Sequence, residues 1–251
     1  MNKDFSILNN YFDKVYVLTL ERATERQHIF IERFPGLKFE FFKGWDNQLF
    51  SMNELKEKKI YDEVAAKKNH RLSRSMTLGQ VGCAMGHRLI YEEMLKNNFN
   101  KVLIFEDDAH PVEKTLISLQ PVLDNQPGNA DILLFDYYRN EKRQPLKQFF
   151  YYVQHALGLL KWNNKMIRNL YPKPFSNYWM KAGYHEFANA YAINSKAAKK
   201  LIELQTPLSF VADHIIPWCI SNEILEGYIS REKLFQQQSQ GGDKTTPSFI
   251  E

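Results

Sequence analysis

Four apolar residues, Val102 to Phe105, run directly into three consecutive carboxylates, Glu106, Asp107 and Asp108. A short apolar run without alternating polar residues is typical of a central strand that is covered on both faces. In open α/β sheets, ligands bind at the carboxyl ends of the strands, so an acidic strand end there faces a crevice. This segment therefore predicts a buried strand with a charged site at its end.

The three carboxylates also carry a chemical implication. Adjacent negative charges repel one another, and either water or a cation relieves that repulsion. Carboxylate oxygens are the hard ligands that magnesium and manganese prefer. The alternative is a solvated acidic turn that closes the strand, because short acidic segments are common in loops.

Length and composition indicate a globular protein. The 251 residues are enough for one domain with a substantial core, and 44% hydrophobic with 25% charged residues is ordinary for that class. The two cysteines, Cys83 and Cys219, form no CxxC pair, which argues against a disulfide framework or a zinc ribbon. The formal net charge of +4 fits an anionic substrate or a negatively charged surface and does not by itself indicate nucleic acid.

The N-terminal segment lacks the pattern of a secretory signal peptide, because Asp4, Asn9, Asn10 and Asp13 interrupt it. No apolar run approaches the length that a membrane-spanning helix needs. We therefore expect a cytoplasmic protein that meets a membrane only from outside, as a peripheral contact on the inner face of the cytoplasmic membrane.

A strand-helix-strand pattern opens the chain. A β-branched apolar strand is predicted at 14–20 and a third strand at 38–43. Between them, Thr24 is placed to cap a helix that ends near Pro35. Such a βαβ unit implies a parallel pair in an α/β sheet.

The helix most clearly marked by its sequence follows Thr77, its expected N-cap, with apolar residues at helical spacing from Val81 to Leu95. Further strands are predicted at 101–105, 132–136 and 189–193, the last followed by a helix that Asn194 caps. Together these elements predict one α/β domain over residues 1–251, with its site along one edge of the sheet.

Residues 137–184 differ in composition from the rest. They contain nine Lys or Arg against Glu141 alone, with Tyr and Trp interleaved and an apolar patch at 156–160. Such a basic aromatic helical insertion is typical of an acceptor-binding subdomain or an interfacial membrane contact. The alternative is a solvated helical pair whose aromatic residues pack on the main core.

Four segments taken together resemble glycosyltransferase family 25. In chain order they are LTLERATERQ, TLGQVGCAMGH, VLIFEDDAH and AYAINSKAAKKL. That family comprises lipooligosaccharide-type sugar transferases and includes the collagen galactosyltransferases among its relatives. The resemblance covers most of the chain except 137–184, and it implies a GT-A-type fold with a Rossmann-like mixed sheet flanked by helices.

The resemblance also implies an activity. It predicts inverting, metal-dependent transfer of a sugar, most often galactose from UDP-galactose, to a saccharide acceptor such as lipooligosaccharide. The cofactor would be Mn²⁺ or Mg²⁺, because a divalent cation neutralises the diphosphate leaving group. A metal-dependent phosphoesterase or nuclease, and a non-catalytic sugar-binding module, are the alternatives.

Several residues are candidates for these roles. The acidic triplet matches the family's DxD-type motif, and the predicted metal ligands are Asp108, Glu106 and His214. The predicted donor-binding residues are Leu20, Arg22, Arg26, His87, Glu106, Asp107, Asp136, Gln238 and Ser239. Guanidinium groups pair with phosphate, although solvated helix charges are an equal alternative for the arginines. A hydrogen-bonded core histidine is the alternative for His87, and a packing histidine for His214.

Inversion requires a general base that takes the proton of the acceptor hydroxyl. The candidates are Asp213, which matches the aspartate that follows the family's AYxIxxxAAxxL helix, and Glu186. Both rank above Asp136 for this role. One departure from the family pattern is Gly86, where many members carry Ser before the histidine, so a hydroxyl contact is lost there.

Overall fold

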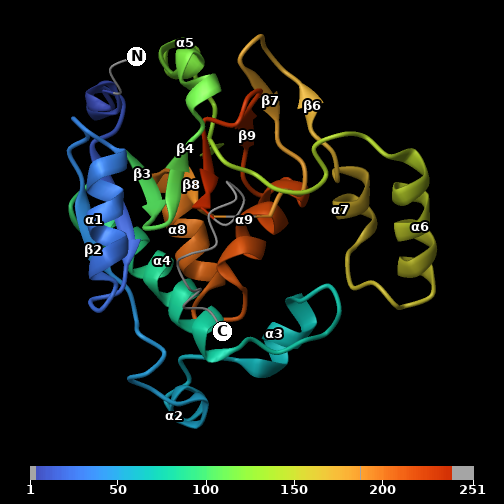
Figure 1. Ribbon diagram of the computed structural model, residues 1–251. Coiled ribbons are helices and arrows are strands. Elements are labelled where there is room, and N and C mark those ends of the chain that lie inside the picture. Colours follow the sequence, from blue (N-terminus) through green and yellow to red (C-terminus); the bar gives the residue numbers. More distant parts are fainter. Residues whose placement is uncertain (1–3, 187, 239–251) are drawn as a thin grey trace.

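A computed structural model describes residues 4–186 and 188–238, so the predicted donor residue Ser239 lies outside the described part. Its centre is an eight-stranded mixed sheet with the order β2-β1-β3-β8-β5-β9-β7-β6. The strands are β1 Lys14–Thr19, β2 Glu40–Lys43, β3 Lys101–Glu106, β5 Ile132–Leu134, β6 Lys173–Pro174, β7 Trp179–Lys181, β8 Ala190–Asn194 and β9 Gly227–Ser230. The expected α/β class with a mixed sheet flanked by helices is confirmed (Figure 1).

Most strands of this sheet run in one direction. β1 is parallel to β2 and to β3, and β5 is parallel to β9. β8 lies between β3 and β5 and is antiparallel to both, so those two neighbours share a direction. The carboxyl ends of β1, β3 and β5 therefore meet at one edge, together with the start of β8.

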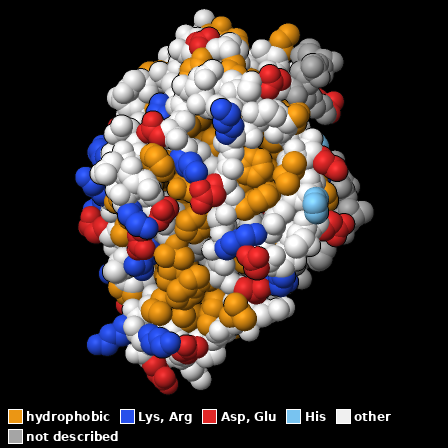
Figure 2. All heavy atoms as spheres, turned by 90° about the vertical axis from the view of Figure 1, so that its left-hand side faces the viewer, with side chains coloured by type: hydrophobic (Ala, Val, Ile, Leu, Met, Phe, Trp, Pro, Cys, Tyr) orange, Lys and Arg blue, Asp and Glu red, His pale blue; other side chains and the backbone are white. Residues whose placement is uncertain are grey.

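The predicted βαβ unit is present. Helix α1, Thr24–Arg33, connects the parallel strands β1 and β2, and its N-cap is Ala23, so Thr24 is the first helical residue and not the cap. β2 forms one edge of the sheet, where Phe39 and Phe41 are only partly buried. Figure 2 shows this side of the molecule, with apolar side chains lying in bands between charged ones.

Alternating side chains of the central strands build two cores on opposite faces of the sheet. Ile104 of β3 points to one face, where helices α4, α8 and α9 pack. Its neighbour Phe105 points to the other face, which η1, α1 and α5 cover. These elements are α4 Leu78–Lys96, α5 Leu119–Asp124, α8 Ser195–Leu204, α9 Ala212–Ser221 and the 3-10 helix η1 Ser6–Asn10. The result is a three-layer α/β/α arrangement (Figure 1).

The N-termini of two helices follow their sequence signals. Thr77 and Gln80 form a reciprocal capping box at the start of α4, as predicted from the position of Thr77. Asn194 accepts a hydrogen bond from the backbone N–H of Ala197 and caps α8, also as predicted. The capping box fixes where α4 begins. The other end of α4 leads directly into β3, the strand that carries the acidic end.

The remaining elements lie around this frame. They are α2 Met52–Glu57, α3 Glu63–Asn69, η2 Glu113–Ser118, α6 Pro145–Ala156, α7 Asn164–Arg168, and the small antiparallel pair of β4 Ala109–Pro111 and β10 Phe235–Gln237. Within the described residues, no helix is both long and apolar enough to cross a membrane.

The 137–184 segment is only partly a helical insertion. Its helices α6 and α7 stand to one side of the sheet (Figure 1, right) around a small core of their own that includes Trp162 and Tyr184. Its last part instead forms β6 and β7, which extend the main sheet through the antiparallel pairing of β7 with β9. The aromatic residue Trp179 explains this, because its side chain is fully buried in the sheet core.

Candidate functional site

The acidic strand end lies where the sheet topology places it. Glu106 is the last residue of β3, and its backbone N–H donates to the carbonyl oxygen of Asn189, just before β8, at 2.9 Å. Asp136 follows β5 on the other side of β8. Three separate segments thus bring polar side chains to one edge of the sheet.

The three consecutive carboxylates have different surroundings. Asp107 is held within the protein: its Oδ2 accepts a hydrogen bond from Thr19 Oγ1 at 2.6 Å, and its Oδ1 pairs with Arg26 Nη1 at 2.9 Å. Burial raises the pKa of Asp107, and the adjacent Arg26 guanidinium opposes that shift. The sequence predicted that Asp107 and Arg26 both bind the donor. In the structure they form an ion pair with each other.

Asp108 has spare coordination capacity. Its Oδ2 accepts a hydrogen bond from Gln237 Nε2 at 3.0 Å, and its backbone oxygen accepts one from the N–H of Gln238 at 2.9 Å. Its Oδ1 is buried and has no hydrogen-bond partner among the described residues. Burial raises the pKa of this carboxyl. A buried carboxylate oxygen without a partner is costly unless something binds it.

Asp136 and Asn189 repeat this pattern beside it. Asn189 Nδ2 donates to Asp136 Oδ2 at 3.1 Å, yet Oδ1 of each residue is buried and has no partner within residues 4–186 and 188–238. Burial raises the pKa of Asp136 to about 6, and the charge of Asp108 adds to that shift. Carbonyl and carboxylate oxygens of this kind are ligands for a hard divalent cation or acceptors for sugar hydroxyls.

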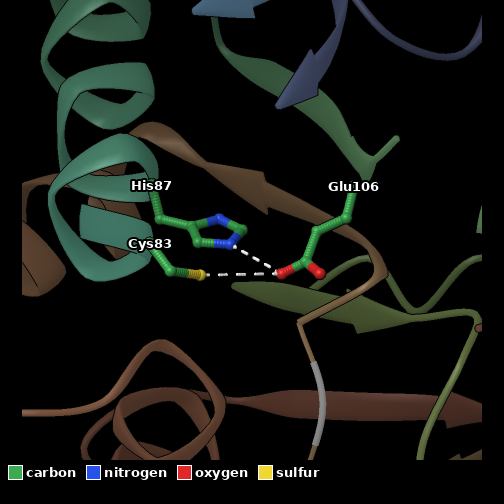
Figure 3. A group of neighbouring side chains, drawn as sticks. All are labelled: Cys83, His87 and Glu106. Carbon is green, nitrogen blue, oxygen red and sulfur yellow. Dashed lines mark hydrogen bonds and ion pairs between the residues drawn. The ribbon is translucent and has the colours of Figure 1, made fainter. Parts of the chain in front are cut away.

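Glu106 lies in a different cluster, with two residues from one face of α4 (Figure 3). Its Oε1 is 3.2 Å from His87 Nε2 and 3.9 Å from Cys83 Sγ. The other ring nitrogen of His87 is 2.8 Å from the hydroxyl of Tyr191, which fixes the ring. This thiol, imidazole and carboxylate set suits a softer metal than magnesium. Among the described residues, it is the one His, Cys, Asp and Glu group close enough to share an ion, and Asp108 is not in it.

A pocket opens at this edge. Its lining residues are Gln80, Cys83, Glu106, Ala188, Asn189, Val211, Ala212, Asp213 and Gln237. Asp213 comes from the first turn of α9 and lines the pocket together with Glu106 of β3. The pocket thus joins the acidic strand end, the start of β8 and one of the two predicted base residues.

The electrostatics of the pocket favour a cation. Burial, then repulsion from Asp108 and Asp107, raise the pKa of Glu106 to about 8. Burial, then repulsion from Glu106, raise the pKa of Asp213 to about 7. These partly buried acids disfavour each other's ionised forms, and a positively charged ligand would relieve that repulsion.

The other predicted residues are less directly placed. Glu186 pairs with Arg139 at 3.2 Å and lies 3.7 Å from Arg71, and it does not line the pocket. The ring of His214 packs beside that of His70, with centroids 5.6 Å apart, and the structure does not bring it into the carboxylate group.

The donor residues predicted near the first strand and the C-terminus make internal contacts. Arg22 forms an ion pair with Asp46 at 2.6 Å. The backbone oxygen of Leu20 accepts a hydrogen bond from Gln27 at 2.9 Å. Gln238 is buried, and its side-chain oxygen accepts a hydrogen bond from Arg33.

Sequence reasoning missed three polar residues of the site. Gln237 contacts Asp108, Asn189 contacts Asp136, and Gln80 lines the pocket. Asn189 carried a usable signal, since it directly precedes a strand. Gln80 and Gln237 carried no such signal. Gln237 reaches Asp108 only through the long-range pairing of β10 with β4.

Comparison with known proteins gives a consistent family. The model described as glycosyltransferase family 25 (LPS biosynthesis protein) matches residues 12–216. A protein of Anopheles gambiae named as a glycosyltransferase 25 family member is 28% identical over 228 residues, which cover 86% of this chain and 33% of that protein.

Two further relatives differ in kind. A Haemophilus influenzae protein named as a glycosyltransferase is 28% identical over 220 residues, covering 84% of this chain and 64% of that protein. Human procollagen galactosyltransferase 2 is 21% identical over 141 residues, covering 54% of this chain and 22% of that protein. The chain thus spans about a third of the length of the mosquito relative and just under two thirds of the bacterial one.

Proposed function

Because the chain belongs to glycosyltransferase family 25, we propose that it transfers a sugar from a nucleotide diphosphate donor to a saccharide acceptor. The donor is UDP-galactose and the acceptor a lipooligosaccharide or a related glycan. The observation that carries this proposal is the pocket that both Asp213 and Glu106, the last residue of β3, line. The transfer proceeds with inversion, by direct attack of the acceptor hydroxyl.

The donor choice has support of two kinds. A relative over 54% of the chain is named as a procollagen galactosyltransferase, which favours galactose. The description of the family refers to LPS biosynthesis, which favours a lipooligosaccharide acceptor. Glucose and related sugars are the donors against which galactose has to be tested.

The residues at the strand end fit a hard divalent cation, Mn²⁺ or Mg²⁺. Asp108 would hold it, because its Oδ1 is a buried carboxylate oxygen without a partner. Asp136 adds a second buried carboxylate oxygen and Asn189 a buried amide oxygen, neither with a hydrogen-bond partner among the described residues. When bound, such a cation neutralises the diphosphate and stabilises the charge that develops as the nucleotide leaves. Manganese and magnesium usually need only one or two protein carboxylates.

Asp213 is the general base of this proposal. It lines the pocket with Glu106 and Gln237, so a hydroxyl bound there lies within its reach. Its raised pKa supports the role, since a base with a pKa near the working pH transfers protons most effectively. Glu186 is a weaker base because Arg139 and Arg71 lie against its carboxylate.

The neighbouring groups shape the site. Arg26 and Thr19 hold Asp107 and so fix the direction of the turn that presents Asp108. His87 and Tyr191 orient Glu106 at the pocket wall. Each of these contacts is made within the chain, so the turn is ordered before any donor binds, which lowers the cost of binding.

The test is product analysis with UDP-galactose, UDP-glucose and GDP-mannose, with and without Mn²⁺, in the presence of a truncated lipooligosaccharide. We expect UDP and a lengthened acceptor, with UDP-galactose the best donor. Release of UMP and a sugar phosphate would instead identify a phosphoesterase. No product from any donor would contradict the proposal.

Variants sharpen this test. Asp108→Asn and Asp213→Asn should each lower the transfer rate at least about a hundredfold, by analogy with the typical contribution of acid–base groups. The matched control is Glu57→Gln, a carboxylate at an exposed position in α2. It should leave the rate unchanged.

A further inference from the structure

Helix α6 directs its apolar side chains outward. Five such residues lie at positions i, i+3, i+4, i+7 and i+11, which is one face of a helix. They are Leu146, Phe149, Phe150, Val153 and Leu157, with exposed fractions of 76%, 62%, 61%, 38% and 67%. No residue of α6 is buried.

The opposite face of α6, which meets the protein, is the more polar one. Lys147, Gln148, Tyr151 and His155 are its partly buried positions. Gln148 Nε2 donates to the backbone oxygen of Ile167 in α7 at 2.6 Å. The Tyr151 and Trp162 rings pack edge to face, with their centroids 5.3 Å apart. The helix is therefore anchored through this face, and its apolar stripe points to solvent. Figure 1 shows α6 at the right, to one side of the sheet.

This orientation is the reverse of the usual one. A surface helix of a globular protein normally turns its apolar stripe to the core, because burial of apolar area drives the packing. A contiguous exposed apolar patch instead marks a surface that meets a partner or a membrane. In α6, two adjacent phenylalanines are each more than 60% exposed, so its apolar stripe is such a patch.

The charges around the stripe identify the partner's chemistry. From residue 142 to residue 184 the chain has no Asp or Glu. Lys142 and Arg143 are exposed just before α6, and Lys161 is exposed just after it. Glu141, which precedes them, is paired with Lys233. The apolar stripe thus lies between exposed positive charges, the pattern of helices that lie in the interface of anionic membranes.

We propose that α6 docks this protein on an anionic lipid bilayer, with the five apolar side chains entering the headgroup region and Lys142, Arg143 and Lys161 contacting the lipid phosphates. The helix lies parallel to the membrane surface, and the remainder of the domain stays in water. This inference does not rest on the proposed transferase activity, because lipid binding needs neither donor nor acceptor.

The test is co-sedimentation of the full chain with vesicles of phosphatidylcholine alone and of phosphatidylcholine with 30 mol% phosphatidylglycerol. We expect binding to the anionic vesicles that weakens as salt is raised, and little binding to the neutral ones. Phe149→Ser/Phe150→Ser should lower the partition coefficient about tenfold or more, because interfacial binding scales with the apolar area that is inserted.

Two matched controls separate this face from the rest of the surface. Leu49→Ser/Val64→Ser removes two apolar side chains that are 82% and 80% exposed elsewhere, and it should leave vesicle binding unchanged. Lys142→Gln/Arg143→Gln should weaken binding by about fivefold for each charge. Lys68→Gln/Lys199→Gln, the same change in net charge at exposed sites outside the 137–184 segment, should have a much smaller effect.

A second readout does not depend on a loss of binding. Phe149→Trp should give a tryptophan signal that brominated phosphatidylglycerol quenches, while Val64→Trp should not. Equal binding by Phe149→Ser/Phe150→Ser and the natural chain would overturn the proposal. The proposal would also be overturned if the natural chain sedimented without vesicles and Phe149→Ser/Phe150→Ser abolished that sedimentation. The apolar face would then join two copies of the chain. Thermal melting checks that each variant is folded.

Discussion

Gln237 Nε2 donates a hydrogen bond to Asp108 Oδ2 at 3.0 Å, whereas Oδ1 of the same carboxylate is buried without a partner in the described part of the chain. One side of Asp108 is therefore fixed by β10, and the other side is left for a ligand. Its neighbour Asp107 is bound on both oxygens by Thr19 and Arg26. Two adjacent carboxylates of the same strand end thus have opposite roles, one structural and one able to bind.

This difference predicts opposite effects on stability. Asp107→Asn should lower the free energy of unfolding by about 2 kcal/mol, because it weakens the charge-assisted hydrogen bonds that Asp107 accepts from Thr19 and Arg26. Asp108→Asn should leave it unchanged or raise it, because it removes a buried charge that repels Glu106. Urea denaturation of both variants without divalent cations measures the contrast. Equal losses in the two variants would contradict it.

The base assignment predicts a difference between two acids. Asp213→Asn should lower kcat by roughly a hundredfold to ten-thousandfold, the usual contribution of a general base. Its KM for the donor should change little, since the donor diphosphate is assigned to the cation beside Asp108 and not to Asp213. Glu186→Gln should cost less than about tenfold in kcat, because its carboxylate is already paired with Arg139. Steady-state kinetics of the two variants decides between them.

The pH dependence of the reaction follows from the same residue. A general base must be ionised to accept a proton, and burial raises the pKa of Asp213 to about 7. The rate should therefore rise with pH through about 7 and level off above it. This limb should disappear in Asp213→Asn. A rate that is constant from pH 5 to pH 8 would contradict the assignment.

The acidic pocket also predicts how stability depends on pH and metal. The pKa values of Glu106, Asp213 and Asp136 are raised to about 8, 7 and 6, above the values near 4 that carboxyls have in an unfolded chain. Above pH 4 the unfolded chain has released protons that the folded chain retains. These groups therefore lower the free energy of unfolding as the pH rises from about 4 to about 8.

A cation bound to the ionised carboxyls should reverse that loss. Mn²⁺ should raise the melting temperature more at pH 8 than at pH 5.5, and Asp108→Asn should reduce the difference. Buried histidines such as His87 and His185 have pKa values lowered to about 4, so they cost stability at acid pH instead. Comparing melts with and without Mn²⁺ at each pH removes their contribution.

Local sequence patterns predicted the central elements of the fold. The apolar run before Glu106 is the central strand β3, and the caps at Thr77 and Asn194 begin α4 and α8. These features succeed because strand burial and helix capping are decided by neighbouring residues. The mixed direction of the sheet and the role of Trp179 in it depend on long-range pairing, which single segments do not reveal.

The site was predictable in position but not in contacts. The sheet edge follows from where strands end, so Asp108 and Asp136 could be named from the residues alone. Asp213 lies in the first turn of α9 and could be named only from the resemblance to the family. The sequence could not show which carboxylate is paired inside the protein, because Arg26 reaches Asp107 only after α1 packs beside β3. The reversed orientation of α6 was likewise hidden, since its apolar spacing is the same whether the stripe is buried or exposed.

The most direct test of the account is calorimetric titration of UDP into the natural chain, into Asp108→Asn and into Glu57→Gln, each with Mn²⁺ and with EDTA. The account predicts that UDP binds the natural chain and Glu57→Gln only when Mn²⁺ is present, and that Asp108→Asn binds it at least tenfold more weakly. UDP binding that is equally tight with EDTA, or unchanged in Asp108→Asn, would contradict the claim that a cation beside Asp108 holds the nucleotide.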